Sequence, residues 1–182
     1  MRLLMKKLLV LLASVFLWTG ASASHIMGGE ITWECQANGQ YVFTLKVYRD
    51  CNGIPGQTSA QTLNIWNYGA FPNTIICNFI SQTDISPPCG FPCSNPTAGS
   101  AEEFVYVSNP VTLTGTPPAN GWVFTWDDCC RNGAIDNLIL TGGGSSGHTL
   151  RAIMYSYTPI GAPTANPADP CYDSSPIFLE SP

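Results

Sequence analysis

The chain has 182 residues, of which 7 are basic and 12 acidic, and hydrophobic residues make up 45% of it. An acidic protein is repelled by the phosphate backbone of nucleic acids and by anionic lipid surfaces, so we expect neither as a partner. This length is enough for one domain with a substantial hydrophobic core.

Residues 1–23 have the pattern of a secretory signal peptide. A positively charged start is followed by an apolar run and by Ala21-Ser22-Ala23, which fits the small-residue cleavage pattern. The basic residues of this segment are Arg2, Lys6 and Lys7. Cleavage before Ser24 leaves 4 basic against 12 acidic residues, a net charge of −8. Because the apolar run is short and has the wrong flanks for a membrane anchor, we expect export without membrane insertion, and the alternative is an uncleaved N-terminal anchor.

Residues 28–51 are predicted to form a β-hairpin. Apolar residues occupy odd-numbered positions in both arms and polar residues alternate with them, as in a strand with one buried face. A two-residue turn at Asn38-Gly39 would place the two apolar faces on opposite sides. A three-residue turn, Ala37-Asn38-Gly39, places them on one side, with Gly39 in the left-handed conformation of a G1 bulge. This turn predicts three opposed pairs: Ile31 with Leu45, Trp33 with Phe43, and Cys35 with Tyr41.

Further strands are predicted along the chain, separated by turn-forming residues about every ten positions. They cover 62–66, 74–79, 102–113 with a break at Pro110, 122–127, 138–141, 150–157 and 177–179. Residues 81–100 contain four prolines and two cysteines, so we interpret them as a long stapled loop. Residues 158–182 read as an extended C-terminal segment.

No stretch after the signal peptide has helical periodicity. The prediction for 24–182 is therefore a single all-β domain. We expect an antiparallel β-sandwich, immunoglobulin-like or jelly-roll-like, that is stapled by disulfides and carries long Pro/Gly loops.

The eight cysteines all follow the signal peptide, and an even number in an exported chain indicates disulfides. The candidates are Cys35, Cys51, Cys77, Cys89, Cys93, Cys129, Cys130 and Cys171. Spacing makes a local Cys89–Cys93 loop plausible. The adjacent Cys129 and Cys130 point opposite ways on a strand and are expected to bond different partners. We expect the hairpin to be linked outward to the 129–130 segment rather than across itself.

Charged residues beside these cysteines are expected to be structural. Arg49-Asp50 and Asp128, Arg131 and Asn132 would form ion pairs and turn hydrogen bonds. If Arg131 is buried, its partner is expected to be a carboxylate, because an unpaired buried charge is expensive.

Three patterns suggest further chemistry, and each has a simpler reading. A candidate cation site is formed by Asp127, Asp128 and Asp136. Calcium is the expected ion, because it prefers oxygen ligands. The simpler reading is that these carboxylates lie at a solvated strand end. A structural zinc site is not expected, because a vicinal cysteine pair rarely gives two ligands to one ion. Residues 143–147 match G-x-S-x-G around Ser145, but a strand-like segment follows where a nucleophile elbow needs a helix.

The aromatic residues divide into two groups. Trp122 and Trp126 share a strand face with Phe124, which favours a place in the core. Trp66 and Tyr68 lie beside a turn and are the candidates for a ligand platform on which sugars stack.

Several segments resemble the opening of large exported surface proteins of Bacteroidetes-type bacteria, the gliding-motility-associated or type IX-secreted proteins. The resemblance is carried by 24–35 (SHIMGGEITWEC), 41–53 (YVFTLKVYRDCNG), 86–89 (SPPC), 126–137 (WDDCCRNGAIDN) and 170–176 (PCYDSSP). It implies an N-terminal cell-surface module ahead of further β domains, with no catalytic residues to carry over. Such proteins are far longer and end in a sorting domain, so the chain is expected to be a fragment or a short relative. A relative without a sorting domain would reside in the periplasm.

These observations favour a non-catalytic extracellular structural or adhesion module of a bacterial cell-surface protein. Its expected partners are glycans or other surface proteins. The alternative is a carbohydrate-binding module that uses exposed aromatics, and a secreted hydrolase is a remote alternative.

Overall fold

The computed structural model describes residues 26–53, 55–88, 92–97, 99–128, 147–156 and 171. Its regular structure in these ranges is entirely β, and the strands pair antiparallel throughout. The strands are β1 (Ile26–Cys35), β2 (Tyr41–Asp50), β3 (Gln61–Trp66), β4 (Thr74–Asp84), β5 (Ala101–Ser108), β6 (Trp122–Asp128) and β7 (His148–Met154). The predicted all-β antiparallel class is therefore confirmed. Within the described ranges, no helix has the length and apolar character needed to cross a membrane.

Strands β1 and β2 form the hairpin in the predicted register. Ile31 lies opposite Leu45, Trp33 opposite Phe43, and Cys35 opposite Tyr41. The Gln36 N–H donates to the Gln40 carbonyl at 2.7 Å, and the Gly39 N–H donates to the Gln36 carbonyl at 2.8 Å. Gly39 has a φ of 78°, where a side chain would be costly. The three-residue bulged turn is confirmed, since only this loop length puts both apolar faces on one side.

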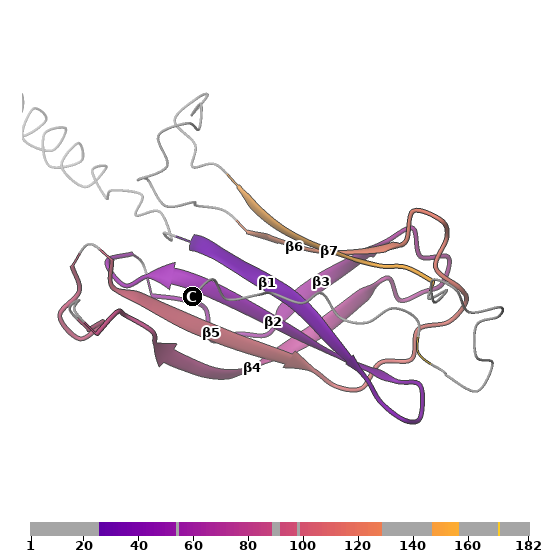
Figure 1. Ribbon diagram of the computed structural model, residues 1–182, viewed down its shortest axis with the longest axis horizontal. Coiled ribbons are helices and arrows are strands. Elements are labelled where there is room, and N and C mark those ends of the chain that lie inside the picture. Colours follow the sequence, from indigo (N-terminus) through magenta and orange to yellow (C-terminus); the bar gives the residue numbers. More distant parts are fainter. Residues whose placement is uncertain are drawn as a thin grey trace, which may run out of the picture.

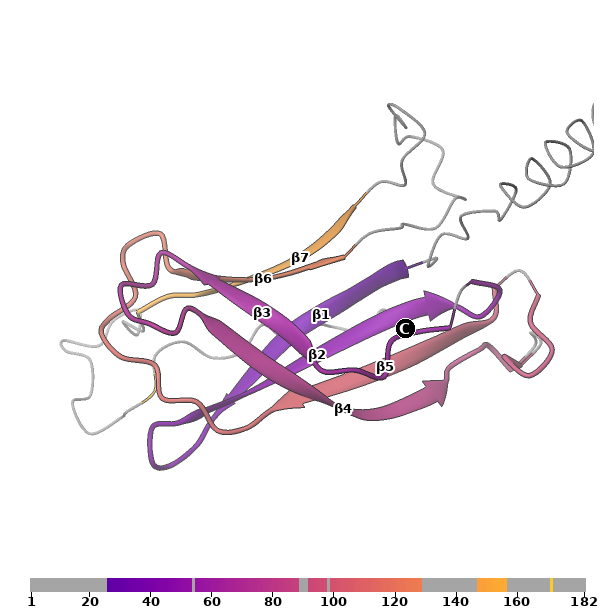
Figure 2. The ribbon, with the colours of Figure 1, turned by 180° about the vertical axis from the view of Figure 1, so that it is seen from behind.

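All seven strands belong to one sheet, in the order β1-β2-β5-β4-β3-β6-β7. Figures 1 and 2 show that this sheet curves back, so that β6 and β7 lie opposite β1 and β2. The Phe124 ring of β6 lies 4.8 Å from the Phe43 ring and 5.7 Å from the Trp33 ring, measured between centroids. One continuous sheet therefore supplies both sides of the hydrophobic core. Trp122, Phe124 and Trp126 are buried, as predicted.

A glycine permits the close approach of the first and last strands in this order. A Cβ on Gly29 of β1 would lie 2.4 Å from the Lys46 carbonyl oxygen and 2.6 Å from Cδ1 of Leu150 on β7. Real Cβ contacts are not that short, so β7 can pack on β1 only because this position lacks a side chain. Strands β1 and β7 are in contact, although they are not paired as neighbours in the sheet.

Several strand boundaries differ from the prediction, most of all in β4, in β5 and in β7, which ends at Met154 instead of residue 157. Strand β4 continues to Asp84 instead of ending at residue 79, so the expected loop at 81–100 is wrong for its first four residues. A register irregularity between Phe79 and Ser81 allows the strand to continue along β5. Strand β5 ends at Ser108, before Pro110. The signal segment 1–23, the expected strands at 138–141 and 177–179, and 158–182 apart from Cys171 lie outside the described residues.

Candidate functional site

The outer sides of β3, β6 and β7 form one continuous surface on the side of the sheet away from the core. Successive side chains of a strand alternate between the two faces of a sheet. The inward residues of β6 are Trp122, Phe124 and Trp126, so the alternation places Val123, Thr125 and Asp127 on the other side, where Val123 and Thr125 are buried and Asp127 is exposed. The register joins these to outward residues of β3 and β7. We name this surface the outer β3–β6–β7 face; it comprises Asn64, Trp66, Val123, Thr125, Asp127, Thr149, Arg151 and Ile153.

Trp66 is the exposed aromatic anchor of this face. Its side chain is 57% exposed, whereas Trp33, Trp122 and Trp126 are buried. The indole Nε1–H donates to Oγ1 of Thr125 at 2.9 Å, which fixes the ring relative to β6. An indole that is both exposed and held by a hydrogen bond can stack on an apolar ring face without first losing much conformational freedom.

Tyr68, the other expected member of the platform, is directed elsewhere. Its ring packs edge-on against the buried Trp122, with centroids 5.1 Å apart, and its hydroxyl lies 3.2 Å from Oγ1 of Thr114. Tyr68 therefore extends the core and fixes a loop. We find no contact between its ring and that of Trp66 among the described residues.

Tyr155 is the second exposed aromatic at this surface, and it was not among the residues expected to form the platform. It follows β7 and is 45% exposed. Continuing the alternation of Arg151 and Ile153 places it on the outer side. A Cβ on Gly121 would lie 3.3 Å from Cδ1 of Tyr155, so the ring packs against a backbone position without a side chain. The alternation along 151–155 was the signal that could have identified it.

A polar row runs beside Trp66 across the three strands. Asn64, Thr125 and Arg151 lie directly opposite one another in the register. Arg151 is exposed and has no ion pair with any residue that the structure describes. The other cationic side chains that the structure describes form ion pairs: Lys46 pairs with Glu30 and Glu103, and Arg49 pairs with Glu102. Arg151 is therefore available for an anionic group at this face.

The aspartates at the end of β6 diverge. Oδ1 of Asp127 accepts a hydrogen bond from the Thr149 hydroxyl at 2.6 Å, and Oδ2 accepts one from Thr125 at 3.4 Å. Asp128 lies on the inward side. The pKa of Tyr106 is raised to about 12, first by burial of Tyr106 itself and then by the charge of Asp128. Because the two carboxylates face opposite sides of the strand, they do not converge on one cation. Asp136, the third residue of the expected cation site, lies outside the described residues.

Two disulfides link distant segments. Cys35 bonds Cys171 across a sequence separation of 136, and Cys51 bonds Cys93 across a separation of 42. The hairpin is thus linked outward, as predicted, but its partners are not Cys129 and Cys130. The expected local Cys89–Cys93 bridge is also wrong, because Cys93 lies against the end of β2. Cys89, Cys129 and Cys130 lie outside the described residues.

Cys77 is a buried free thiol rather than a disulfide partner. It lies in the core on β4, and burial raises its pKa to about 12. Since the thiolate is the reactive form, this cysteine is a packing residue and not a nucleophile.

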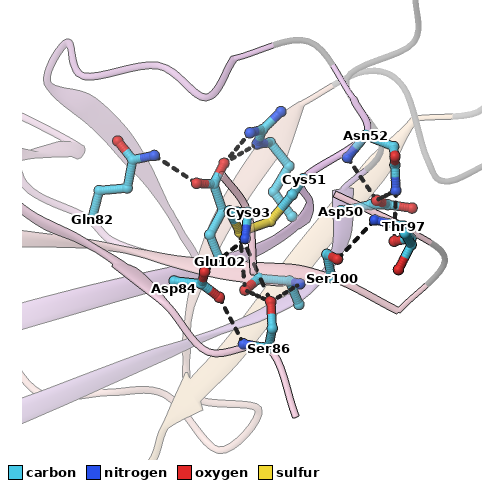
Figure 3. Close-up of a disulfide and its surroundings, with 12 residues drawn as sticks. Asp50, Cys51, Asn52, Gln82, Asp84, Ser86, Cys93, Thr97, Ser100 and Glu102 are labelled. Atoms are coloured by element: carbon cyan, nitrogen blue, oxygen red, sulfur yellow. Dashed lines mark hydrogen bonds and ion pairs between the residues drawn. A yellow bond between two sulfur atoms is a disulfide. The ribbon is translucent and has the colours of Figure 1, made fainter. Parts of the chain in front are cut away.

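A buried ion pair lies next to the Cys51–Cys93 disulfide. Arg49 on β2 and Glu102 on β5 are directly opposed, and both are buried. Arg49 Nε donates to Oε1 of Glu102 at 2.5 Å, and its Nη2 pairs with the same oxygen. Gln82 donates to the other carboxylate oxygen at 2.5 Å, and Figure 3 shows Gln82 reaching Glu102 from the neighbouring strand. Arg49 thus forms the structural ion pair expected for it, with a partner that the sequence did not identify.

Asp84 anchors the loop that carries Cys93. Its oxygens accept hydrogen bonds from the backbone N–H groups of Ser86, at 2.9 Å, and Cys93, at 2.7 Å (Figure 3). Hydrogen bonds from Ser86 and then from Cys93 lower the pKa of the Asp84 carboxyl. Near this anchor, the sulfurs of Cys51 and Cys93 and a carboxylate oxygen of Glu102 lie within 4.8 Å of one another. The sulfurs are joined covalently and Glu102 is held by Arg49, so this group is a structural cluster rather than a metal site.

The described residues do not complete the hydrolase pattern. Ser145 lies outside them, and His148 begins β7, so a strand follows the G-x-S-x-G segment as the sequence predicted. A scan against protein-family models, a search of curated proteins and a search of solved structures each return no match to the chain.

Proposed function

We propose that this chain is a non-catalytic, extracellular adhesion module of a Bacteroidetes-type bacterial surface protein, and that it binds through the outer β3–β6–β7 face. The observation that carries the proposal is the exposed Trp66, which is fixed by its hydrogen bond to Thr125 on a disulfide-stapled sheet.

The scaffold suits an adhesive role because it resists local opening. The two disulfides tie the hairpin to segments far along the chain. The Arg49–Glu102 pair and the Asp84 anchor hold the region around Cys93. Such disulfides persist in oxidising compartments, which supports export to the cell surface, or to the periplasm if no sorting domain follows.

Carbohydrate is the second candidate for what this face binds, the first being another surface protein. Exposed aromatics beside amide, hydroxyl and guanidinium groups supply both stacking and hydrogen bonds. The outer β3–β6–β7 face has this combination in Trp66, Asn64, Thr149 and Arg151, whereas Thr125 is buried and only holds the indole.

Bead attachment under flow tests the proposal. Beads coated with the mature chain are passed over surfaces coated with polysaccharides or with proteins. We expect retention on at least one surface, and we expect Trp66→Ala to reduce it at least tenfold. Ile80→Ala, which also shortens an exposed apolar side chain but on β4, should be retained like the wild type. If the wild type attaches to none of the surfaces, the adhesive role is wrong.

A further inference from the structure

We infer that the outer β3–β6–β7 face binds a carboxylate-bearing glycan, with a sugar ring stacked on Trp66 and its carboxylate paired with Arg151. The inference rests on the proposed function, because it supposes that this face is the adhesive surface. It adds the chemical class of the ligand.

Trp66 on β3 and Arg151 on β7 lie on the same side of the sheet, with β6 between their strands. Trp66 reaches toward β6 and donates to Thr125, and Thr125 is directly opposite Arg151 on β7. The backbones of β3 and β7 are two strand spacings, about 9.6 Å, apart, and the indole covers part of this distance by reaching to β6. A ring stacked over the indole can therefore place a substituent beside the guanidinium.

Arg151 is chemically suited to a carboxylate. A guanidinium presents parallel N–H groups that can bind both oxygens of a carboxylate. Forming this contact breaks no existing ion pair of Arg151 with the described residues. A neutral sugar would gain the stacking contact but would leave this cation unpaired.

The surrounding charges favour a single orientation of the ligand. The chain is acidic as a whole, with 12 acidic against 7 basic residues, so an anionic ligand is repelled from most of its surface. On the outer β3–β6–β7 face, Asp127 lies two residues from Thr125 and is held by the hydroxyls of Thr125 and Thr149. It repels a carboxylate at that end and can accept hydrogen bonds from sugar hydroxyls. The ligand carboxylate is thereby directed toward Arg151.

Matched saccharides test the inference directly. The full mature chain is titrated by calorimetry with neutral hexasaccharides of gluco, manno and galacto configuration and with their uronate counterparts. In at least one pair, we expect the uronate to bind at least tenfold more tightly than the neutral sugar. Arg151→Gln should abolish the preference, because it should weaken binding of the uronate far more than binding of the neutral sugar, and Trp66→Ala should weaken both at least tenfold. Lys46→Gln removes the same charge from a site on β2 and should leave the preference unchanged.

Equal affinities within every pair, or a uronate preference that survives in Arg151→Gln, would overturn the inference. If no saccharide binds but the beads still attach to protein surfaces, the inference fails and the adhesive function stands. If both measurements are negative, both proposals fail. Circular dichroism of each variant shows whether it is folded, and Arg151→Lys provides a second variant that keeps the charge but not the paired donors.

Discussion

At the scale of single residues, the chain separates buried charge, which has a structural role, from exposed charge, which is available to a ligand. Arg49 and Glu102 satisfy each other inside the fold, whereas Arg151 is exposed on the outer β3–β6–β7 face. The sequence predicted an ion pair at Arg49 but gave no means of choosing Glu102. That choice depends on the pairing of β2 with β5, which brings together residues 53 positions apart.

Loss of one partner of this buried pair should be costly. Arg49→Ala leaves the Glu102 carboxylate buried without a cation, so we expect the free energy of unfolding to fall by about 3–5 kcal/mol. Lys46→Ala removes a more exposed cation and should cost about 0–1 kcal/mol. Urea unfolding followed by tryptophan fluorescence measures both. The double variant Arg49→Met with Glu102→Leu should recover most of the stability that Arg49→Ala loses. If Arg49→Ala and Lys46→Ala lose similar amounts, the structural role of the buried pair is contradicted.

The thiol of Cys77 should be inert in the folded protein. Burial raises its pKa to about 12, so very little thiolate is present at pH 8, and the core also excludes reagents. We expect iodoacetamide to label Cys77 only after unfolding in urea, as measured by peptide mass spectrometry. Rapid labelling in native buffer would show that this part of β4 is not buried as described.

At the scale of secondary-structure elements, local sequence patterns predicted strands and the hairpin register. They did not predict which distant segments pair with one another. The hairpin register followed from the parity of apolar positions, because a shift by one residue exposes the whole apolar set. The continuation of β4 to Asp84 was missed, since a bulge interrupts the alternation that identifies a strand. Tyr68 was expected to be exposed because it lies near a turn, whereas its ring packs against Trp122.

The approach of β7 to β1 depends on Gly29. Gly29→Ala places a Cβ against the Lys46 carbonyl and the Leu150 side chain, so we expect a loss of about 1–3 kcal/mol from overpacking. Gly28→Ala is the matched control, because a Cβ on the neighbouring residue meets nothing within 4 Å. Thermal unfolding of both variants provides the comparison. Equal melting temperatures would mean that β1 and β7 are not in tight contact.

At the scale of the whole molecule, the fold is one sheet held together by covalent links between remote segments. The all-β class followed from composition and periodicity, but the order β1-β2-β5-β4-β3-β6-β7 did not, because several partners are far apart in the chain. The sequence also did not determine which cysteines bond to each other, because the bonded residues are far apart in the chain. Spacing favoured a local Cys89–Cys93 loop, whereas packing of that region against the end of β2 placed Cys93 beside Cys51.

Both disulfides should contribute to global stability. Replacing Cys35 and Cys171 by serine should cost about 2–5 kcal/mol, and replacing Cys51 and Cys93 somewhat less, because the first bond closes the longer loop. Peptide mapping without reduction checks the pairing, and urea unfolding measures the losses. A map that joins Cys35 to Cys51, or Cys89 to Cys93, would contradict this arrangement.

Selective oxidation of Trp66 tests the central claim that the outer β3–β6–β7 face is the adhesive surface. The other tryptophans of the described chain, Trp33, Trp122 and Trp126, are buried, so limited N-bromosuccinimide should oxidise Trp66 first. Peptide mass spectrometry locates the oxidised residue, and bead retention measures attachment. We predict that oxidation at Trp66 abolishes attachment and that a bound surface protects Trp66 from the reagent. Full attachment of the Trp66-oxidised chain, or equal oxidation of Trp66 with and without the bound surface, would contradict the claim.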